Sequence, residues 1–123
     1  MKTEDILNLD CRKEENKKII QKVLRKIKPL SKYSDECEIP LEAIEKLLAV
    51  MCKKYCVNIK EITANVLAND KQIIWKATII NENEFALLNY VYGISIYEVL
   101  SKSTIYIYTK VKKGIKIRDK GGS

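Results

Sequence analysis

The chain has no histidine and few glycines or prolines: its 123 residues include four glycines, two prolines, one tryptophan and one phenylalanine. Without histidine, no site here can use the side chain that most often serves as a general base or metal ligand. Gly93 and Gly114 are the only glycines before the terminal Gly121-Gly122-Ser123, which is typical of a tag remnant, so the sequence has no glycine-rich phosphate-binding loop. No apolar run approaches the roughly 20 residues that span a bilayer, and we expect no membrane partner.

The acidic residues form no catalytic pattern. Asp35, Glu36 and Glu38 lie in a polar stretch, and Glu42 and Glu98 suit the positive ends of helices. Catalytic carboxylates are usually surrounded by apolar or glycine-bearing strand ends, and none of these residues has that setting. We therefore expect a binding protein without a cofactor, and not an enzyme.

The four cysteines are spaced more like core residues than like a metal site. Cys52 and Cys56 stand four apart, a spacing that can present two ligands on one helix face. A closed tetrahedral site would also need Cys11 and Cys37 from distant segments, so we expect buried thiols and no metal. Residues 1–10 carry three acids and no apolar segment like that of a signal peptide, which predicts a cytoplasmic protein with reduced thiols.

The net charge of +7 is concentrated in two stretches. Residues 12–28 hold eight basic residues against two acidic ones, and residues 110–120 hold six against one, so these stretches sum to +11 and the remainder to −4. Such asymmetry predicts a polyanionic partner. The alternative is a lysine-rich surface that is only solvated, because AT-rich coding also produces frequent lysine.

Helical patterns dominate the first half of the chain. Residues 3–9 suit a short turn, and residues 12–28 form an amphipathic helix with a narrow apolar stripe. Pro29 ends this helix, and a polar linker follows it. A second amphipathic helix is expected over residues 41–55, with Pro40 at its start.

From Val57 onward, apolar and polar residues alternate, which is typical of strands. We expect strands over residues 57–68, 72–80 and 85–92, with a bulge at Lys60-Glu61 and a turn at Asn69-Asp70. Three strands joined by short turns make an antiparallel meander, and such a sheet is stable only when helices cover one of its faces.

The sharpest local signal lies between Gly93 and Gly114. Ser95-Ile96-Tyr97-Glu98 is a capping box: the Ser95 hydroxyl can accept from the Glu98 N–H, while the Glu98 carboxylate reaches back to the Ser95 N–H. The lysines just before Gly114 suit the negative end of a helix, and Gly114 suits its C-cap. One long helix that ends near Lys113 is therefore predicted.

The residues of this last helix leave one alternative open. Residues 104–111 also alternate with β-branched and aromatic side chains, so a helix ending near Lys102, then a strand and a partner strand at 115–117, is possible. On the long-helix interpretation, Lys102 points away from the core. Ile105 and Tyr106 would also face outward and form an exposed apolar patch.

These elements predict an α+β fold in the order α-α-β-β-β-α, with an antiparallel three-stranded meander and helices packed on it. We expect residues 1–120 to form a single domain. It would consist of a basic amphipathic helix (12–28), an αβββα core (40–113) and a basic tail (114–120).

From Pro40 to Lys113, the order helix, three strands, helix resembles the double-stranded-RNA-binding domain. In that family, the last helix begins with a lysine-rich motif that grips phosphates. The matching segment here is Ser95-Ile96-Tyr97-Glu98, which has no lysine. The resemblance thus implies a core topology like that of the family.

Short motifs in the second half are similar to small uncharacterised proteins of phages and mobile elements in Gram-positive bacteria. The motifs are Trp75-Lys76-Ala77-Thr78-Ile79, Val91-Tyr92-Gly93, Tyr97-Glu98-Val99-Leu100 and Lys102. Small accessory proteins of that origin include inhibitors of host defence nucleases, anti-CRISPR proteins among them. This resemblance implies that inhibition of a defence nuclease is one activity to expect.

We expect a small non-enzymatic binding protein of phage or mobile-element type that acts on nucleic acid or on a nucleic-acid-bound protein complex. The expected contact residues are Lys18, Lys22, Arg25, Lys28, Lys110, Lys112, Lys113 and Lys116. The alternative is a protein-interaction module or homodimer that uses Ile105, Tyr106 and an exposed sheet edge. Aromatic side chains that could stack on bases or anchor a protein are Trp75, Tyr90, Tyr92, Tyr97 and Tyr106, although Trp75 and Tyr90 are more simply half-buried sheet residues.

Overall fold

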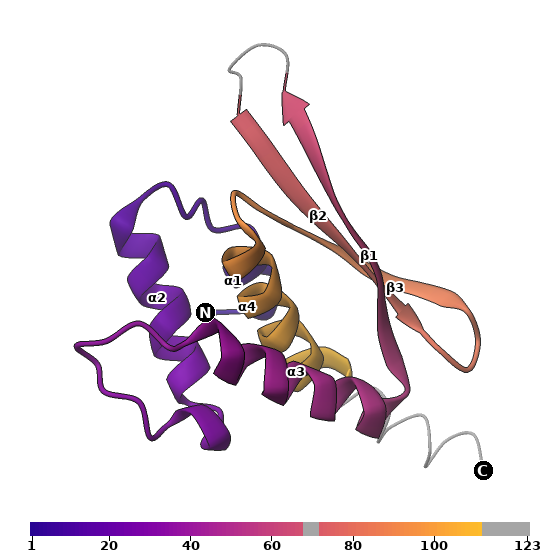
Figure 1. Cartoon of the computed structure of the whole chain (residues 1–123), viewed down its shortest axis with the longest axis horizontal. Coiled ribbons are helices and arrows are strands. Elements are labelled where there is room, and N and C mark those ends of the chain that lie inside the picture. Colours follow the sequence, from indigo (N-terminus) through magenta and orange to yellow (C-terminus); the bar gives the residue numbers. More distant parts are fainter. Residues whose placement is uncertain (68–71, 112–123) are drawn as a thin grey trace.

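The computed structural model describes residues 1–67 and 72–111. Its elements are α1 (Thr3–Leu7), α2 (Glu14–Arg25), the 3₁₀ turn η1 (Lys28–Leu30), α3 (Leu41–Tyr55), β1 (Val57–Leu67), β2 (Gln72–Asn81), β3 (Ala86–Gly93), α4 (Ile96–Tyr106) and the π-helical turn η2 (Ile107–Val111). The predicted α+β fold and the order of its helices and strands are confirmed (Figure 1). Within these two ranges, no helix has the length and apolar content needed to cross a bilayer.

The sheet is the predicted antiparallel meander, with β2 between β1 and β3. The register of β1 against β2 shifts between Ile59 and Glu61, which confirms the expected bulge. A second irregularity lies between Ile79 and Ile80, in the pairing of β2 with β3. The expected turn at Asn69-Asp70 lies outside the described residues.

One face of the sheet packs on the helices and contributes the smaller part of the core. Ala77 and Ile79 of β2 and Val91 of β3 are buried on that face. They belong to one apolar cluster with residues of the helices, among them Val99 and Ile105 of α4. The alternation of apolar and polar residues that predicted the strands therefore reflects two faces of the sheet, one in the core and one outside it.

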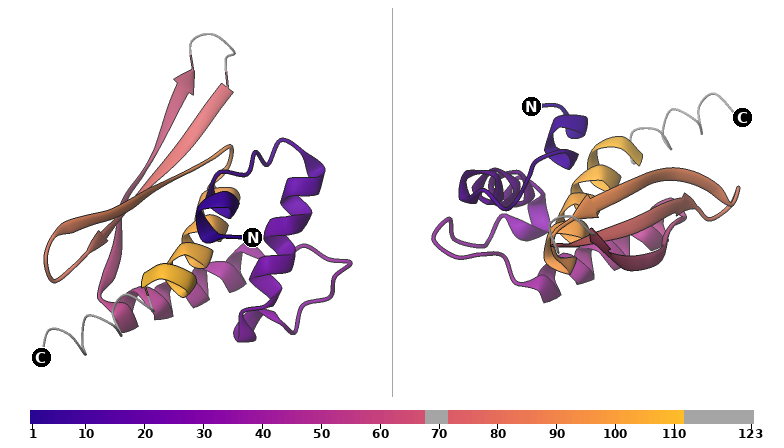
Figure 2. Two further views of the ribbon diagram at one scale, coloured as in Figure 1. Left: turned by 180° about the vertical axis from the view of Figure 1, so that it is seen from behind. Right: turned by 90° about the horizontal axis from the view of Figure 1, so that it is seen from above.

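α4 is the central helix of the molecule. It contacts β2 and β3 on one side and α1, α2 and α3 on the others, and Figure 2 shows it enclosed by these elements in both views. Its residues from Glu98 to Ile105 are all buried. The helix continues into η2, so the alternative of a strand over residues 104–111 is wrong. The expected C-terminal cap at Lys112, Lys113 and Gly114 lies beyond the described chain, as does the alternative strand at 115–117.

The β1–β2 ribbon extends past the helices at one end (Figures 1 and 2). Near that end, Val66 and its register partner Ile73 are 68% and 48% exposed, although they stand on the same face as the buried Ala77. Apolar and polar residues thus alternate along the whole ribbon, but the helices cover only part of its apolar face.

Candidate functional site

The structure brings three of the predicted basic residues together along α2. Lys18, Lys22 and Arg25 stand on one flank of this helix, where they line a groove of about 610 Å³ together with residues 35–38 of the loop between η1 and α3. Lys18 and Lys22 are exposed and make no ion pair with any described residue. Being four residues apart, they stand about 6 Å apart along the helix axis.

The end of that loop is fixed to α2 and α4 by three hydrogen bonds. The Gln21 side-chain oxygen accepts from the Ile39 N–H at 3.0 Å, and the Gln21 amide donates to the Tyr97 hydroxyl at 2.8 Å. The Tyr97 hydroxyl donates in turn to the Ile39 carbonyl at 2.5 Å. Burial raises the pKa of Tyr97, so its hydroxyl remains a donor at neutral pH.

Arg25 connects the same loop to the helix further along. Its Nη2 donates to the Cys37 carbonyl, and its Nε lies 3.7 Å from Oδ1 of Asp35. The charged residues that line the groove are four basic ones, Lys17, Lys18, Lys22 and Arg25, and four acidic ones, Glu14, Asp35, Glu36 and Glu38. The formal charge of the groove is therefore zero, which the basic pattern of α2 alone does not suggest.

The other predicted basic residues are placed elsewhere or lie outside the described chain. Lys28 is exposed in η1. Lys110 pairs with Glu4 of α1 at 2.9 Å, and this contact lowers the pKa of Glu4. Lys112, Lys113 and Lys116 are not among the described residues. Residues 112–123 contain five basic residues and one acidic residue, so they supply four of the seven net positive charges.

The predicted apolar patch on the last helix is wrong. Ile105 is fully buried, and Tyr106 is half-buried. The Tyr106 hydroxyl donates a hydrogen bond to the Leu88 carbonyl at 3.4 Å. Burial raises the pKa of Tyr106. The prediction assumed that α4 covers the sheet as an outer layer, whereas α1, α2 and α3 cover the opposite side of α4.

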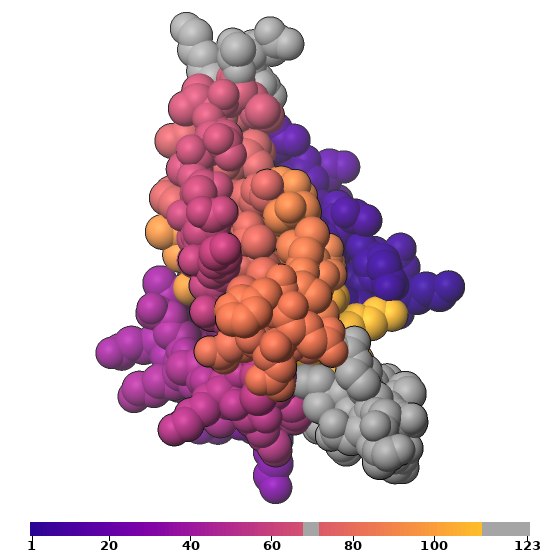
Figure 3. Space-filling model, turned by 90° about the vertical axis from the view of Figure 1, so that its right-hand side faces the viewer, coloured from indigo at the N-terminus to yellow at the C-terminus, as the bar shows by residue number. Residues whose placement is uncertain are grey.

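Exposed aromatic residues instead lie on the face of the sheet turned away from the helices. Tyr90 and Tyr92 of β3 are 41% and 50% exposed, and Leu87 of the same strand is 50% exposed. Phe85, at the turn before β3, is 83% exposed. Lys76 is the register partner of Tyr92, and its Nζ lies 4.0 Å from the centre of the Tyr90 ring, a cation–π contact. Figure 3 shows the strands side by side on this face, with no described helix across them.

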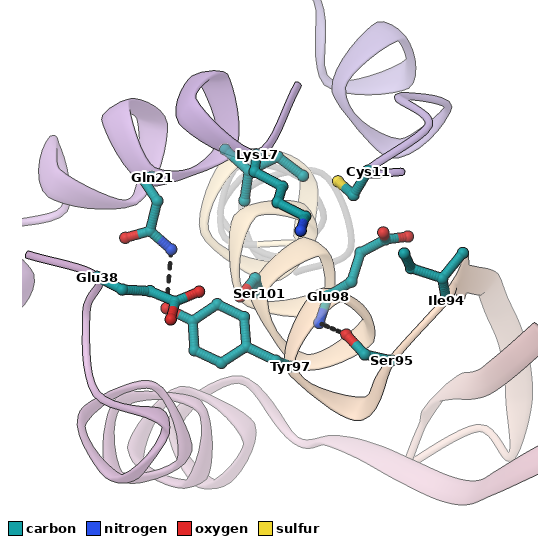
Figure 4. Close-up of a pocket in the computed structure, with 10 residues that line it drawn as sticks. Cys11, Lys17, Gln21, Glu38, Ile94, Ser95, Tyr97, Glu98 and Ser101 are labelled. Atoms are coloured by element: carbon teal, nitrogen blue, oxygen red, sulfur yellow. Dashed lines mark hydrogen bonds between the residues drawn. The ribbon is translucent and has the colours of Figure 1, made fainter. Parts of the chain in front are cut away.

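A second cavity, of about 310 Å³, opens between α2 and the start of α4 (Figure 4). Lys17 and Gln21 of α2 form one wall, Glu38 stands beside Tyr97, and Ser101 lies deeper. The Ser101 hydroxyl and the Oε1 atom of Glu98 are buried, and neither has a hydrogen-bond partner among the described residues. Such atoms lower stability, because they lose hydration without gaining a bond.

Sequence reasoning missed a buried ion pair beside this cavity. Lys102 is 3% exposed, not directed outward as predicted, and its Nζ donates to Glu98 Oε2 at 3.0 Å. It also donates to the Leu9 carbonyl at 2.8 Å and to the Tyr92 carbonyl at 3.2 Å. The three acceptors use all three protons of the ammonium group. The spacing of glutamate before lysine at i and i+4 was the available signal, but it is common on exposed helices too.

The predicted capping box is only half formed for the same reason. The Ser95 hydroxyl accepts from the Glu98 N–H at 3.1 Å, as expected. The Glu98 carboxylate, however, turns to Lys102 and packs against Gly93, where a Cβ atom would lie only 2.5 Å from Oε2. Glycine is therefore required at position 93 because the Glu98 side chain occupies the space that a Cβ atom would fill. Ending a strand is not its only role.

The cysteines differ in their surroundings. Cys11 is buried, and desolvation, with Glu98 nearby, raises its pKa to about 12. Cys52 is half-buried, with a pKa raised by burial, whereas Cys37 is exposed. Cys56 lies past the end of α3 with a left-handed backbone (φ 53°), so it does not share a helix face with Cys52. Among the described residues, no three cysteine or acidic side chains are grouped as metal ligands would be.

The chain matches no protein-family model, and no curated protein or solved structure is significantly similar to it. The resemblances noted in its sequence therefore depend on short motifs and on element order alone.

Proposed function

We propose that the chain is a small non-enzymatic binding protein that acts on nucleic acid or on a protein complex that holds nucleic acid. The observation that carries this proposal is that two exposed lysines on α2, Lys18 and Lys22, make no ion pair with a residue of the described chain. They stand beside Arg25 in a groove open to solvent. Lysines in such a row contact successive phosphates and release counterions, which provides affinity without reading the base sequence.

The test is fluorescence anisotropy with labelled 20-nucleotide single-stranded and duplex DNA and RNA, at several salt concentrations. We expect binding that weakens steeply with salt. Replacing Lys18 and Lys22 by alanine removes two phosphate contacts, so the slope of log K against log salt should fall by about 1.4 to 1.8. The matched control replaces Lys46 and Lys53, two exposed lysines of α3, and should leave the slope unchanged.

Two results would contradict this proposal. One is the absence of binding to any of the four probes at low salt. The other is an equal loss of affinity in the α2 variant and in the α3 variant, because this would mean that only the net charge matters.

The identity of the partner is proposed from the sequence resemblance. Short motifs of the second half are similar to small proteins of phages and mobile elements. Small accessory proteins of that origin include inhibitors of host defence nucleases. We propose accordingly that the nucleic-acid-bound complex belongs to host defence and that the protein inhibits its nuclease, as an anti-CRISPR protein does. A cleavage assay with candidate nucleases tests this, and unchanged cleavage at saturating protein would contradict it for each nuclease.

A second candidate function is a protein interaction without nucleic acid, which the exposed side chains of β3 favour. Leu87, Tyr90 and Tyr92 form a strip with Phe85 at the preceding turn, and exposed apolar groups of this kind mark protein contacts. Self-association would give a mass that rises with concentration. Replacing Tyr92 by aspartate should abolish it, whereas Val50→Asp on the exposed side of α3 should not. A constant monomer mass would exclude the homodimer.

A further inference from the structure

An acidic segment of the chain itself faces the basic flank of α2. Asp35, Glu36 and Glu38 line the groove opposite Lys18 and Lys22. Phosphate oxygens and carboxylate oxygens are both acceptors for lysine and arginine. The acidic segment therefore presents to α2 the same chemistry that a nucleic-acid backbone would present.

The contacts of this segment with α2 are of two unequal kinds. Ile39, directly after the segment, is held by hydrogen bonds to Gln21 and Tyr97, which fix the position of the segment's C-terminal end. Its carboxylates are held loosely: Asp35 is 98% exposed and lies 3.7 Å from the Arg25 Nε. An ion pair with one fully solvated partner at this distance contributes little, so a ligand with several phosphates can replace it at small cost.

We propose that residues 35–38 act as an internal electrostatic competitor for nucleic acid: they line the groove opposite the basic flank of α2 and lower its affinity for phosphate backbones. This inference rests on the proposed function. Because the segment belongs to the same chain, its carboxylates are present at a high effective concentration beside α2. They also repel incoming phosphates before contact, an effect that falls as salt rises.

The experiment compares two variants that each remove three negative charges. The first carries Asp35→Asn, Glu36→Gln and Glu38→Gln. The matched control carries Glu45→Gln, Glu61→Gln and Glu82→Gln, three exposed acids outside the groove. Affinity for the labelled 20-nucleotide DNA and RNA probes is measured by anisotropy between low and physiological salt.

We expect the groove variant to bind about eightfold more tightly than the native chain at low salt, if each of the three removed carboxylates accounts for roughly a factor of two. The control should gain clearly less. Adding Lys18→Ala and Lys22→Ala to the groove variant should cancel the gain, because these two lysines are the proposed phosphate contacts that the carboxylates across the groove weaken. Unfolding midpoints close to that of the native chain verify that each variant is folded.

Equal gains in the groove variant and in the control would overturn the inference, because net charge would then be sufficient to explain them. An unchanged affinity in the groove variant would overturn it too. Both results leave the proposed function in place, since the native chain still binds. If neither the native chain nor the groove variant binds any probe, the inference and the proposed function fail together.

Discussion

At the scale of single residues, the buried pair of Glu98 and Lys102 has the widest effect on the molecule. Through its ammonium group, Lys102 joins three segments: the stretch after α1 at Leu9, the end of β3 at Tyr92, and α4 itself. Taking two charges out of water is expensive, and the pair recovers this cost only while both partners are present. It therefore acts more as a constraint on geometry than as a net source of stability.

Replacing Lys102 by methionine should destabilise the fold by about 3 to 5 kcal/mol, because a buried carboxylate would remain without its partner. Denaturant unfolding followed by circular dichroism measures this loss. The double variant Glu98→Gln, Lys102→Met should be markedly more stable than the single one, since it leaves no unpaired charge. Lys53→Met, at an exposed position of α3, should change stability by less than about 0.5 kcal/mol. A loss that is equal in the single and double variants would contradict the role given to the charge.

Cys11 should be the least reactive thiol of the chain. Burial, with Glu98 nearby, raises its pKa to about 12, so at neutral pH it is protonated as well as covered. Alkylation with iodoacetamide at pH 8, followed by mass spectrometry, should modify the exposed Cys37 first and Cys11 only on unfolding. Modification of Cys11 at the rate of Cys37 would contradict the burial described here.

The same pKa predicts a dependence of stability on alkaline pH. A thiol whose pKa is higher in the folded than in the unfolded chain contributes stability that is fully present below the unfolded value of about 9. That contribution is lost as the pH rises from about 9 to about 12. A Cys11→Ala variant should lose less stability than the native chain over this range, and equal losses would contradict the assignment.

At the scale of elements, α4 combines a correct prediction with a wrong one. Its start at Ser95 was predictable, because capping depends on residues three apart in the chain. Its outward face was not, because a helix pattern shows which residues share a side and not how many sides are covered. With α1, α2 and α3 packed around it, even Ser101, Ser103 and Thr104 are fully buried.

This placement predicts opposite effects for one substitution at two serines of that region. Ser95→Ala removes the cap and should cost about 1 kcal/mol. Ser103→Ala should be neutral or stabilising by up to about 1 kcal/mol, because the Ser103 hydroxyl is buried with no partner within residues 1–67 and 72–111, and alanine is the better helix former. Denaturant unfolding of the two variants measures both changes in the free energy of unfolding. A clear loss of stability from Ser103→Ala would show that this hydroxyl does have a partner.

At the scale of the whole molecule, the cover over the sheet is uneven. Ala77 and Ile79 of β2 lie against the helices and are fully buried, whereas Val66 and Ile73 stand in the uncovered part of the same ribbon. Hydrogen exchange should therefore be faster at residues 62–67 and 73–75 than at residues 77–79, by at least about tenfold, since local opening there exposes less apolar surface. Uniform protection along β2 would contradict this prediction.

The candidate binding surfaces were predictable only in part. The basic character of α2 is evident in the sequence, and Lys18, Lys22 and Arg25 do share one flank. The acidic residues opposite them were also visible, but as parts of a linker, and their position across a groove depends on Ile39 being held by Gln21 and Tyr97. The exposure of Tyr90 follows from the absence of a described helix on the outer face of the sheet, which no local pattern encodes.

By itself, the sequence determined the elements and their order, because periodicity, caps and turns are local properties that act within a few residues. Only the tertiary structure decided that α4 is the centre of the fold and not its lid, and that Lys102 is buried while Tyr92 is exposed. It also decided that a basic helix faces an acidic segment of its own chain. The physical reason is that burial and electrostatic pairing depend on neighbours far apart in the sequence, and these are assigned only when the layers pack.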